Sequence, residues 1–130
     1  MRGTSLVLLW IIRIGGIIQI VVGLLFWTGR ALNLLPMHML IGLLVALSVL
    51  LVSILAWRTG GRPGAVIAGV LLALALPALG MTQMGLLVGS WHWIIRVLHL
   101  AIGVGALGVG DSLANYVRGV RSPERAPSPA

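Results

Sequence analysis

The stretch MHMLIGLLVALSVLLVSILAW, residues 37–57, decides the fold class of this chain. It contains no acidic residue, lysine or arginine, and a helix needs roughly 20 such apolar residues to cross a bilayer core of about 30 Å. Comparable apolar segments occupy 6–27, 65–82 and 91–117. The connections between them are short, so neighbouring helices should be antiparallel. The sequence therefore predicts an all-α integral membrane protein, a four-helix up-down bundle within 1–117.

The composition supports the same environment. Hydrophobic residues make up 59% of the chain and charged residues only 8%, whereas about a quarter of a soluble domain is charged. The net charge of +7 comes from arginines that punctuate apolar runs, so we predict contact with membrane lipid and no nucleic-acid binding. The chain has no cysteine, which excludes disulfides, thiolate metal sites and thiol redox chemistry.

The arginines also predict the orientation. Arg30 lies in a loop on one side, and the other side collects Arg2, Arg58, Arg62, Arg118, Arg121 and Arg125. By the positive-inside rule we expect a multi-pass protein of the bacterial cytoplasmic membrane with both termini in the cytoplasm. The first apolar segment contains Arg13 and lacks an Ala-x-Ala site, so we expect a retained helix. Residues 118–130, rich in Pro, Ser and Arg, are predicted to be a disordered cytoplasmic tail.

Three histidines are the candidate chemical groups, and all fall in the outer half of the predicted bundle. His38 and His99 precede Arg58 and Arg118 by nearly the same number of residues, which places them at about the same depth. They open the similar strings HMLIG and HLAIG, a faint internal repeat. His92 lies seven residues closer to the surface, roughly 10 Å, and is predicted at the interface.

The two deeper histidines predict a haem site. In an up-down bundle the second and fourth helices are diagonal neighbours, with axes about 11–14 Å apart. That separation suits two imidazoles that reach a flat macrocycle from opposite sides. Gly42 and Gly103 follow the histidines at the fourth position, on the same helix face, and are predicted to leave room for a porphyrin edge. We therefore predict one haem b with His38 and His99 as its iron ligands.

Basic groups on the outer side are candidates to bind the haem propionates. Arg96 lies one turn outward of His99 on the same face, and Arg30 and His92 lie nearer the surface. Arginine suits carboxylates because its donors form a bidentate fork. His92 lies between Trp91 and Trp93, as an interfacial anchor would, and its use as a ligand in place of His99 stays open.

This arrangement resembles the small bacterial transmembrane b-type cytochromes of the cytochrome b561 kind. The resemblance rests on four helices, on His38 and His99 at matched depth, and on Gly42 and Gly103. It implies histidine-ligated haem b in a four-helix bundle that exchanges electrons with quinone or another redox partner at the outer face. The sequence departs from the diheme members because no second histidine pair exists near the other face. One haem is all that its histidines support.

Other polar residues within the apolar segments have structural and functional interpretations. Arg13 and Asp111 are predicted at similar depth on neighbouring helices and are expected to form a buried ion pair, since an unpaired charge there is expensive. We favour a clasp between helices over a proton or quinone site, with snorkelling of Arg13 as a further alternative. Gln19 has two open roles, donating to a backbone carbonyl or to a ligand. Candidates for a dimer face, which would make a homo-oligomer, are Gly105, Gly108 and Gly110.

Two further classes of function stay open beside the cytochrome. One is a cofactor-free membrane subunit or assembly factor whose histidines are polar anchors. The other is a small transporter or channel with Arg13, Gln19 and Asp111 along its path. The sequence assigns no enzymatic activity. A haem protein should depend on His38 and be coloured, whereas a transporter should depend on Asp111.

Overall fold

The computed structural model describes residues 2–120, and these are helical and contain no strand. The first helix is continuous and combines α1 (Arg2–Trp10), a π-helical turn η1 (Ile11–Gly15) and α2 (Gly16–Trp27); we call it the N-terminal helix. The remaining long helices are α3 (Leu35–Arg58), α4 (Pro63–Thr82) and α5 (His92–Val120). Single 3-10 turns flank them at η2 (Leu32–Leu34) and η3 (Gln83–Gly85).

Within residues 2–120, four helices are long and apolar enough to cross a membrane: Gly3–Trp27, Leu32–Arg58, Pro63–Gly85 and His92–Val120. The four predicted segments, as helices of sufficient length and apolar composition, and the all-α class are thus confirmed. The last helix continues three residues past the predicted boundary at 117. The rest of the predicted tail, with Arg121 and Arg125, lies outside the described residues.

Backbone signals in the sequence explain where the helices begin and end. Proline near the first position starts α3 and α4, where its missing N–H costs nothing. Gly29 and Gly60 adopt positive φ after α2 and α3. In both cases the N–H group of the residue after the glycine returns to the last helical turn, from Arg30 to the Leu25 carbonyl and from Gly61 to the Ala56 carbonyl. These Schellman-type closures turn the chain sharply into the next helix.

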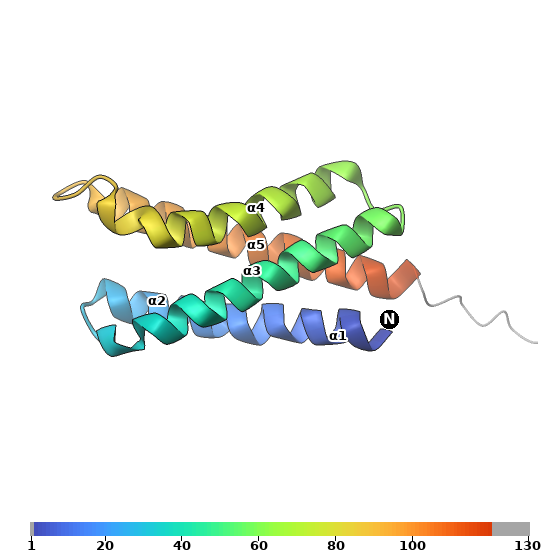
Figure 1. The fold of residues 1–130 in the computed structure, drawn as a ribbon, viewed down its shortest axis with the longest axis horizontal. Coiled ribbons are helices and arrows are strands. Elements are labelled where there is room, and N and C mark those ends of the chain that lie inside the picture. The colour runs from blue at the N-terminus through green and yellow to red at the C-terminus, as the bar shows by residue number, and fades with distance from the viewer. Residues whose placement is uncertain (1, 121–130) are drawn as a thin grey trace, which may run out of the picture.

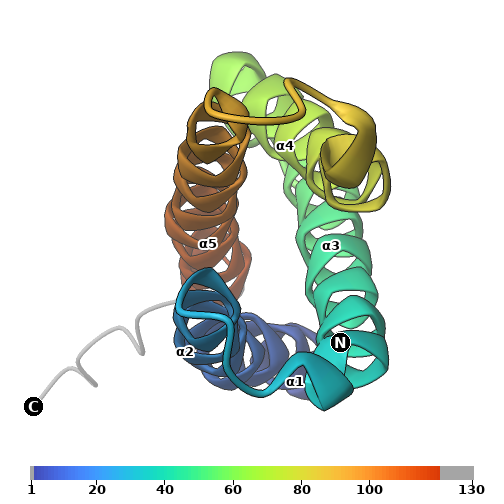
Figure 2. The same ribbon diagram turned by 90° about the vertical axis from the view of Figure 1, so that its left-hand side faces the viewer.

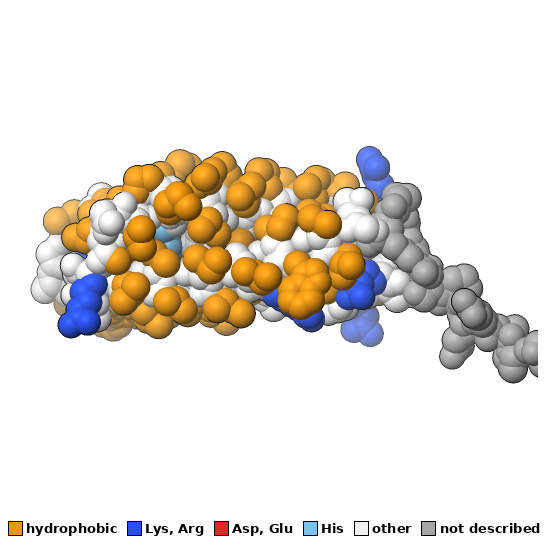
Figure 3. All heavy atoms as spheres, turned by 90° about the horizontal axis from the view of Figure 1, so that it is seen from below, with side chains coloured by type: hydrophobic (Ala, Val, Ile, Leu, Met, Phe, Trp, Pro, Cys, Tyr) orange, Lys and Arg blue, Asp and Glu red, His pale blue; other side chains and the backbone are white. Residues whose placement is uncertain are grey.

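The bundle has two chemically different ends (Figure 1). The connections 28–34 and 83–91 lie at one end, which we call the histidine end. The connection 59–62 and the end of α5 lie at the other, the arginine end, with Arg58, Arg62 and Arg118 exposed there. Hydrophobic side chains cover most of the face between the ends, and basic groups gather toward the arginine end with a further one at the histidine end (Figure 3).

The buried core is concentrated toward the arginine end. Its members come from all four helices: Leu8, Leu9, Ile12, Val49, Val52, Ala56, Val66, Ala73, Leu113, Ala114 and Val117. Toward the histidine end, only Ile95 among the described hydrophobic residues of α5 before Ala106 is buried. The half that carries His38 and His99 therefore has fewer buried hydrophobic side chains than the other half.

The packing of α3 against α5 corrects one expectation. In the arginine half these helices contact each other directly, and a Cβ placed on Gly110 of α5 would lie 2.9 Å from Val49 Cγ2 of α3. The predicted diagonal separation is therefore wrong for that half. Toward the histidine end the two hairpins spread, and α3 and α5 occupy opposite corners (Figures 1 and 2). Small residues on α5 explain the close approach, because they let backbones meet.

Candidate functional site

Two imidazoles lie in the half of the bundle toward the histidine end. His38 is on α3 and His99 is on α5, the two helices that diverge there. His38 is in the first turn of α3 and His99 is two turns into α5, and both side chains are half-buried. A pale-blue histidine side chain is visible between apolar neighbours toward the histidine end (Figure 3). Both residues predicted as ligands thus lie toward the histidine end of the bundle.

Neither imidazole is satisfied by the protein. Nδ1 of His38 and Nδ1 of His99 are buried and have no hydrogen-bond partner in the described part of the chain. The Nε2 atoms are not among the buried unpaired atoms, and no hydrogen bond reaches them from residues 2–120, so they are accessible. A buried polar atom without a partner costs free energy, so both imidazoles are candidates for binding a further group.

His38 is positioned by three contacts from α2. Gln19 Nε2 donates a 2.5 Å hydrogen bond to the backbone carbonyl of His38. The Phe26 ring meets the imidazole edge-on, with centroids 5.1 Å apart. A Cβ on Gly23 would lie 3.7 Å from His38 Cε1, so the imidazole packs across this glycine. Of the two open roles for Gln19, the structure thus shows donation to a carbonyl.

His99 is backed in the same way by a glycine of the preceding helix. A Cβ on Gly80 of α4 would lie 3.3 Å from His99 Cε1. The glycines singled out by sequence spacing have other neighbours, because Gln19 lies 3.4 Å from the Cβ position of Gly42 and Leu76 lies 3.7 Å from that of Gly103. The backing glycines, Gly23 and Gly80, carried no sequence signal, since only the register between helices places them against the imidazoles.

The remaining predicted site residues lie around the histidine end. Within residues 2–120, none of them forms a hydrogen bond with the imidazole of His38 or His99. Arg96 and Arg30 are exposed. His92 lies at the start of α5, and its Nδ1 is 3.0 Å from the Leu86 carbonyl oxygen. That contact holds His92 to the connection before α5, as expected for an interfacial anchor, and leaves His99 as the unsatisfied histidine of this helix.

The number of available ligands limits what the site could hold. No cluster of three or more His, Asp or Glu side chains that could hold a metal ion exists within residues 2–120. A metal held by His38 and His99 would therefore need its other ligands from outside these side chains. A porphyrin supplies four nitrogens in a plane and leaves two positions for imidazoles. The accessible Nε2 atoms of two histidines on opposite corners fit that requirement.

Arg13 and Asp111 form the predicted ion pair, with Arg13 Nε 2.6 Å from Asp111 Oδ1. The expected burial is wrong, because the side chains are 43% and 34% exposed. Asn115 Nδ2 donates to the other carboxylate oxygen over 2.9 Å, and the guanidinium lies 5.9 Å from the centre of the Trp10 ring. Arg13 belongs to the π-helical turn η1, a feature that often re-aims a side chain at a functional position.

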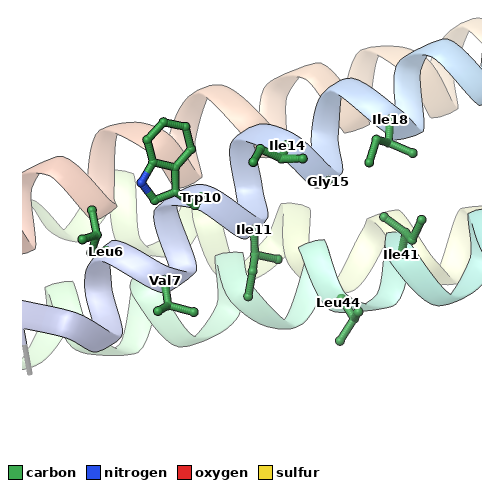
Figure 4. Close-up of a pocket in the computed structure, with 9 residues that line it drawn as sticks. All are labelled: Leu6, Val7, Trp10, Ile11, Ile14, Gly15, Ile18, Ile41 and Leu44. Carbon is green, nitrogen blue, oxygen red and sulfur yellow. The ribbon is translucent and has the colours of Figure 1, made fainter.

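An apolar groove of about 500 Å³ lies on the outside, between the N-terminal helix and α3 (Figure 4). Its walls are aliphatic side chains together with Trp10 and Gly15, and Ile41 and Leu44 contribute from α3. Its lining contains no titratable group.

Comparison with known proteins does not identify a family for this chain. No family model, curated protein or solved structure matches the chain.

Proposed function

We propose that this protein is an integral membrane b-type cytochrome, an up-down bundle that binds one haem b between His38 and His99 near one face of the bilayer. Its role would be electron transfer or small-molecule redox chemistry, with quinone or another redox partner at that face. The observation that carries the proposal is the pair of unsatisfied imidazoles on the diverging ends of α3 and α5. The divergence of the two hairpins at the same end supports it, because a large planar group needs helices that are set apart (Figures 1 and 2).

Different residues of the chain would bind the haem iron, orient the imidazoles and meet the propionates. His38 and His99 would hold the haem iron through nitrogen, and Gly23 and Gly80 would orient their rings by close contact. Haem b supplies one-electron redox chemistry when bound. With two histidines as iron ligands, electron transfer would be favoured over the binding of oxygen. Arg96 and Arg30, exposed on the same half, would meet the propionates.

The charge distribution supports an orientation for the bundle. Arg58, Arg62 and Arg118 lie at the arginine end, against Arg30 beyond the apolar segments at the histidine end. By the positive-inside rule the arginine end would face the cytoplasm of a bacterium, with both termini on that side. The haem would then lie near the outer face.

A visible absorption spectrum of the detergent-purified protein, before and after dithionite, tests this function. We expect a sharp Soret band and narrow α and β bands on reduction, the signature of six-coordinate haem b. His38→Ala and His99→Ala should each abolish these narrow bands. His92→Ala is the matched control and should retain them, because Leu86 already engages that imidazole.

A protein that stays colourless after haem is added would contradict the cytochrome. The cofactor-free subunit would then be the better interpretation, with both histidines as anchors. Loss of the bands in His92→Ala but not in His99→Ala would move the haem toward the surface and overturn the proposed ligand pair.

A further inference from the structure

The ion pair between Arg13 and Asp111 leaves two hydrogen-bond donor groups of the guanidinium unused. Arg13 engages Asp111 through Nε alone, and neither of its Nη groups donates a hydrogen bond to residues 2–120. Both side chains are exposed by more than a third, 43% for Arg13 and 34% for Asp111. They lie within helices that are long and apolar enough to span a membrane. Charged groups in such segments normally face protein or a water-filled cavity rather than lipid.

The neighbouring face of α5 is also polar and lacks large side chains. Ser112 and Asn115 are exposed there, next to Asp111. Gly108, one turn away, is exposed as well, and a Cβ at this position would meet nothing within 4 Å. Gly110, by contrast, is buried against Val49, so it cannot belong to a dimer face.

We propose that a second copy of this chain covers this face, α5 against α5, to form a two-fold symmetric dimer. The face carries donors on Arg13 and acceptors on Asp111 and Ser112, so its charges and hydrogen-bonding groups complement those of its own two-fold copy. The unused guanidinium donors of one copy meet the acceptors of the other. Gly108 lets the two backbones approach closely enough for these short side chains to bond. The inference rests on the proposed membrane insertion and is independent of haem.

Cysteine cross-linking tests the contact directly, because the chain has no cysteine of its own. Gly108→Cys places one thiol in open space on the proposed interface. Leu71→Cys, at a 62% exposed position near the middle of α4, is the matched control. Oxidation in native membranes should convert Gly108→Cys to a disulfide-linked dimer in much higher yield than Leu71→Cys. Equal yields would overturn the proposal.

The role of the ion pair is tested by the monomer–dimer equilibrium in detergent, followed by sedimentation. Arg13→Gln should raise the dimer dissociation constant about tenfold, the effect of losing one good polar contact between membrane helices. Gly108→Leu should leave only monomer. A dimer that persists in Gly108→Leu would refute the interface, and so would a wild-type monomer that retains phospholipid at this face. The haem spectrum should be unchanged in both variants, which separates this test from that of the cytochrome.

Discussion

Gln19 of α2 holds the backbone of His38 on α3 through a 2.5 Å hydrogen bond from its Nε2 to the His38 carbonyl. The same carboxamide lies 3.4 Å from the Cβ position of Gly42, one turn further along α3. A single polar side chain thus ties the N-terminal helix to the turn that carries a candidate ligand. A side chain larger than hydrogen at position 42 would leave little room for this tie.

Replacing Gln19 with leucine should therefore destabilise the bundle by about 1 kcal/mol, the usual net contribution of one hydrogen bond. The measurement is the free energy of unfolding in detergent. Gln83→Leu is the control, since Gln83 is half-buried at the same end but its side chain makes no hydrogen bond within residues 2–120. Equal losses in the two variants would show that Gln19 acts only by packing.

The two backing glycines should respond differently to alanine. A Cβ at Gly80 would come 3.3 Å from His99 Cε1, which is tight, whereas a Cβ at Gly23 would be 3.7 Å from His38 Cε1, an ordinary contact. Gly80→Ala should displace the imidazole and lower haem affinity about tenfold, as changes that misorient a ligand do. Gly23→Ala should bind haem normally. Titration with haem, followed at the Soret band, measures both, and a reversed order would contradict the geometry.

Core packing gives a second pair of glycine variants on α5. A Cβ at Gly110 would lie 2.9 Å from Val49 and 3.2 Å from Ile12, both buried. Gly110→Ala should cost about 1–2 kcal/mol of unfolding free energy, since overpacking outweighs the better helix propensity of alanine. Gly105→Ala meets only Leu72 at 3.7 Å and should be neutral or stabilising. Thermal unfolding would detect the difference, and a stabilised Gly110→Ala would show that the core yields easily.

Exchanging the charges at positions 13 and 111 tests whether Arg13 and Asp111 interact in the detergent-purified protein as they do in the structure. Arg13→Asp alone and Asp111→Arg alone each place like charges together and should lower the melting temperature. The double reversal should recover most of the loss, because the two residues are in direct contact. Additive effects in this double-mutant cycle would mean that the 2.6 Å contact contributes nothing to stability.

The elements that depend on composition could be predicted from the sequence. The four apolar segments were recovered with shifts of a few residues, because a long charge-free run determines a helix by itself. The Arg13–Asp111 contact followed from counting residues inward from the arginine end. Depth along a helix is simple to count because the rise per residue is constant.

The features that depend on how helices face each other could not be predicted. The π-helical turn Ile11–Gly15 ends at Gly15 and is followed by Gly16. An added Cβ would press against Val45 at Gly15 and against Leu107 at Gly16. Such close approaches depend on rotation and register between helices. The exposure of the ion pair and the backing of the imidazoles by Gly23 and Gly80 are of this kind. Predicted burial failed for Arg13 because counting gives depth but not direction.

Because the core is concentrated in the arginine half, we expect the two halves of the molecule to open with different free energies. Amide protons of α3 beside Val49 and Val52, and of α5 beside Leu113, should exchange only in rare global openings. Amide protons near His38 and His99 lie where few side chains are buried, so they should exchange through frequent local openings. The arginine half would then act as a rigid clamp that holds four helix ends in register. The other half would be free to open and close around whatever the imidazoles bind, without unfolding the whole protein.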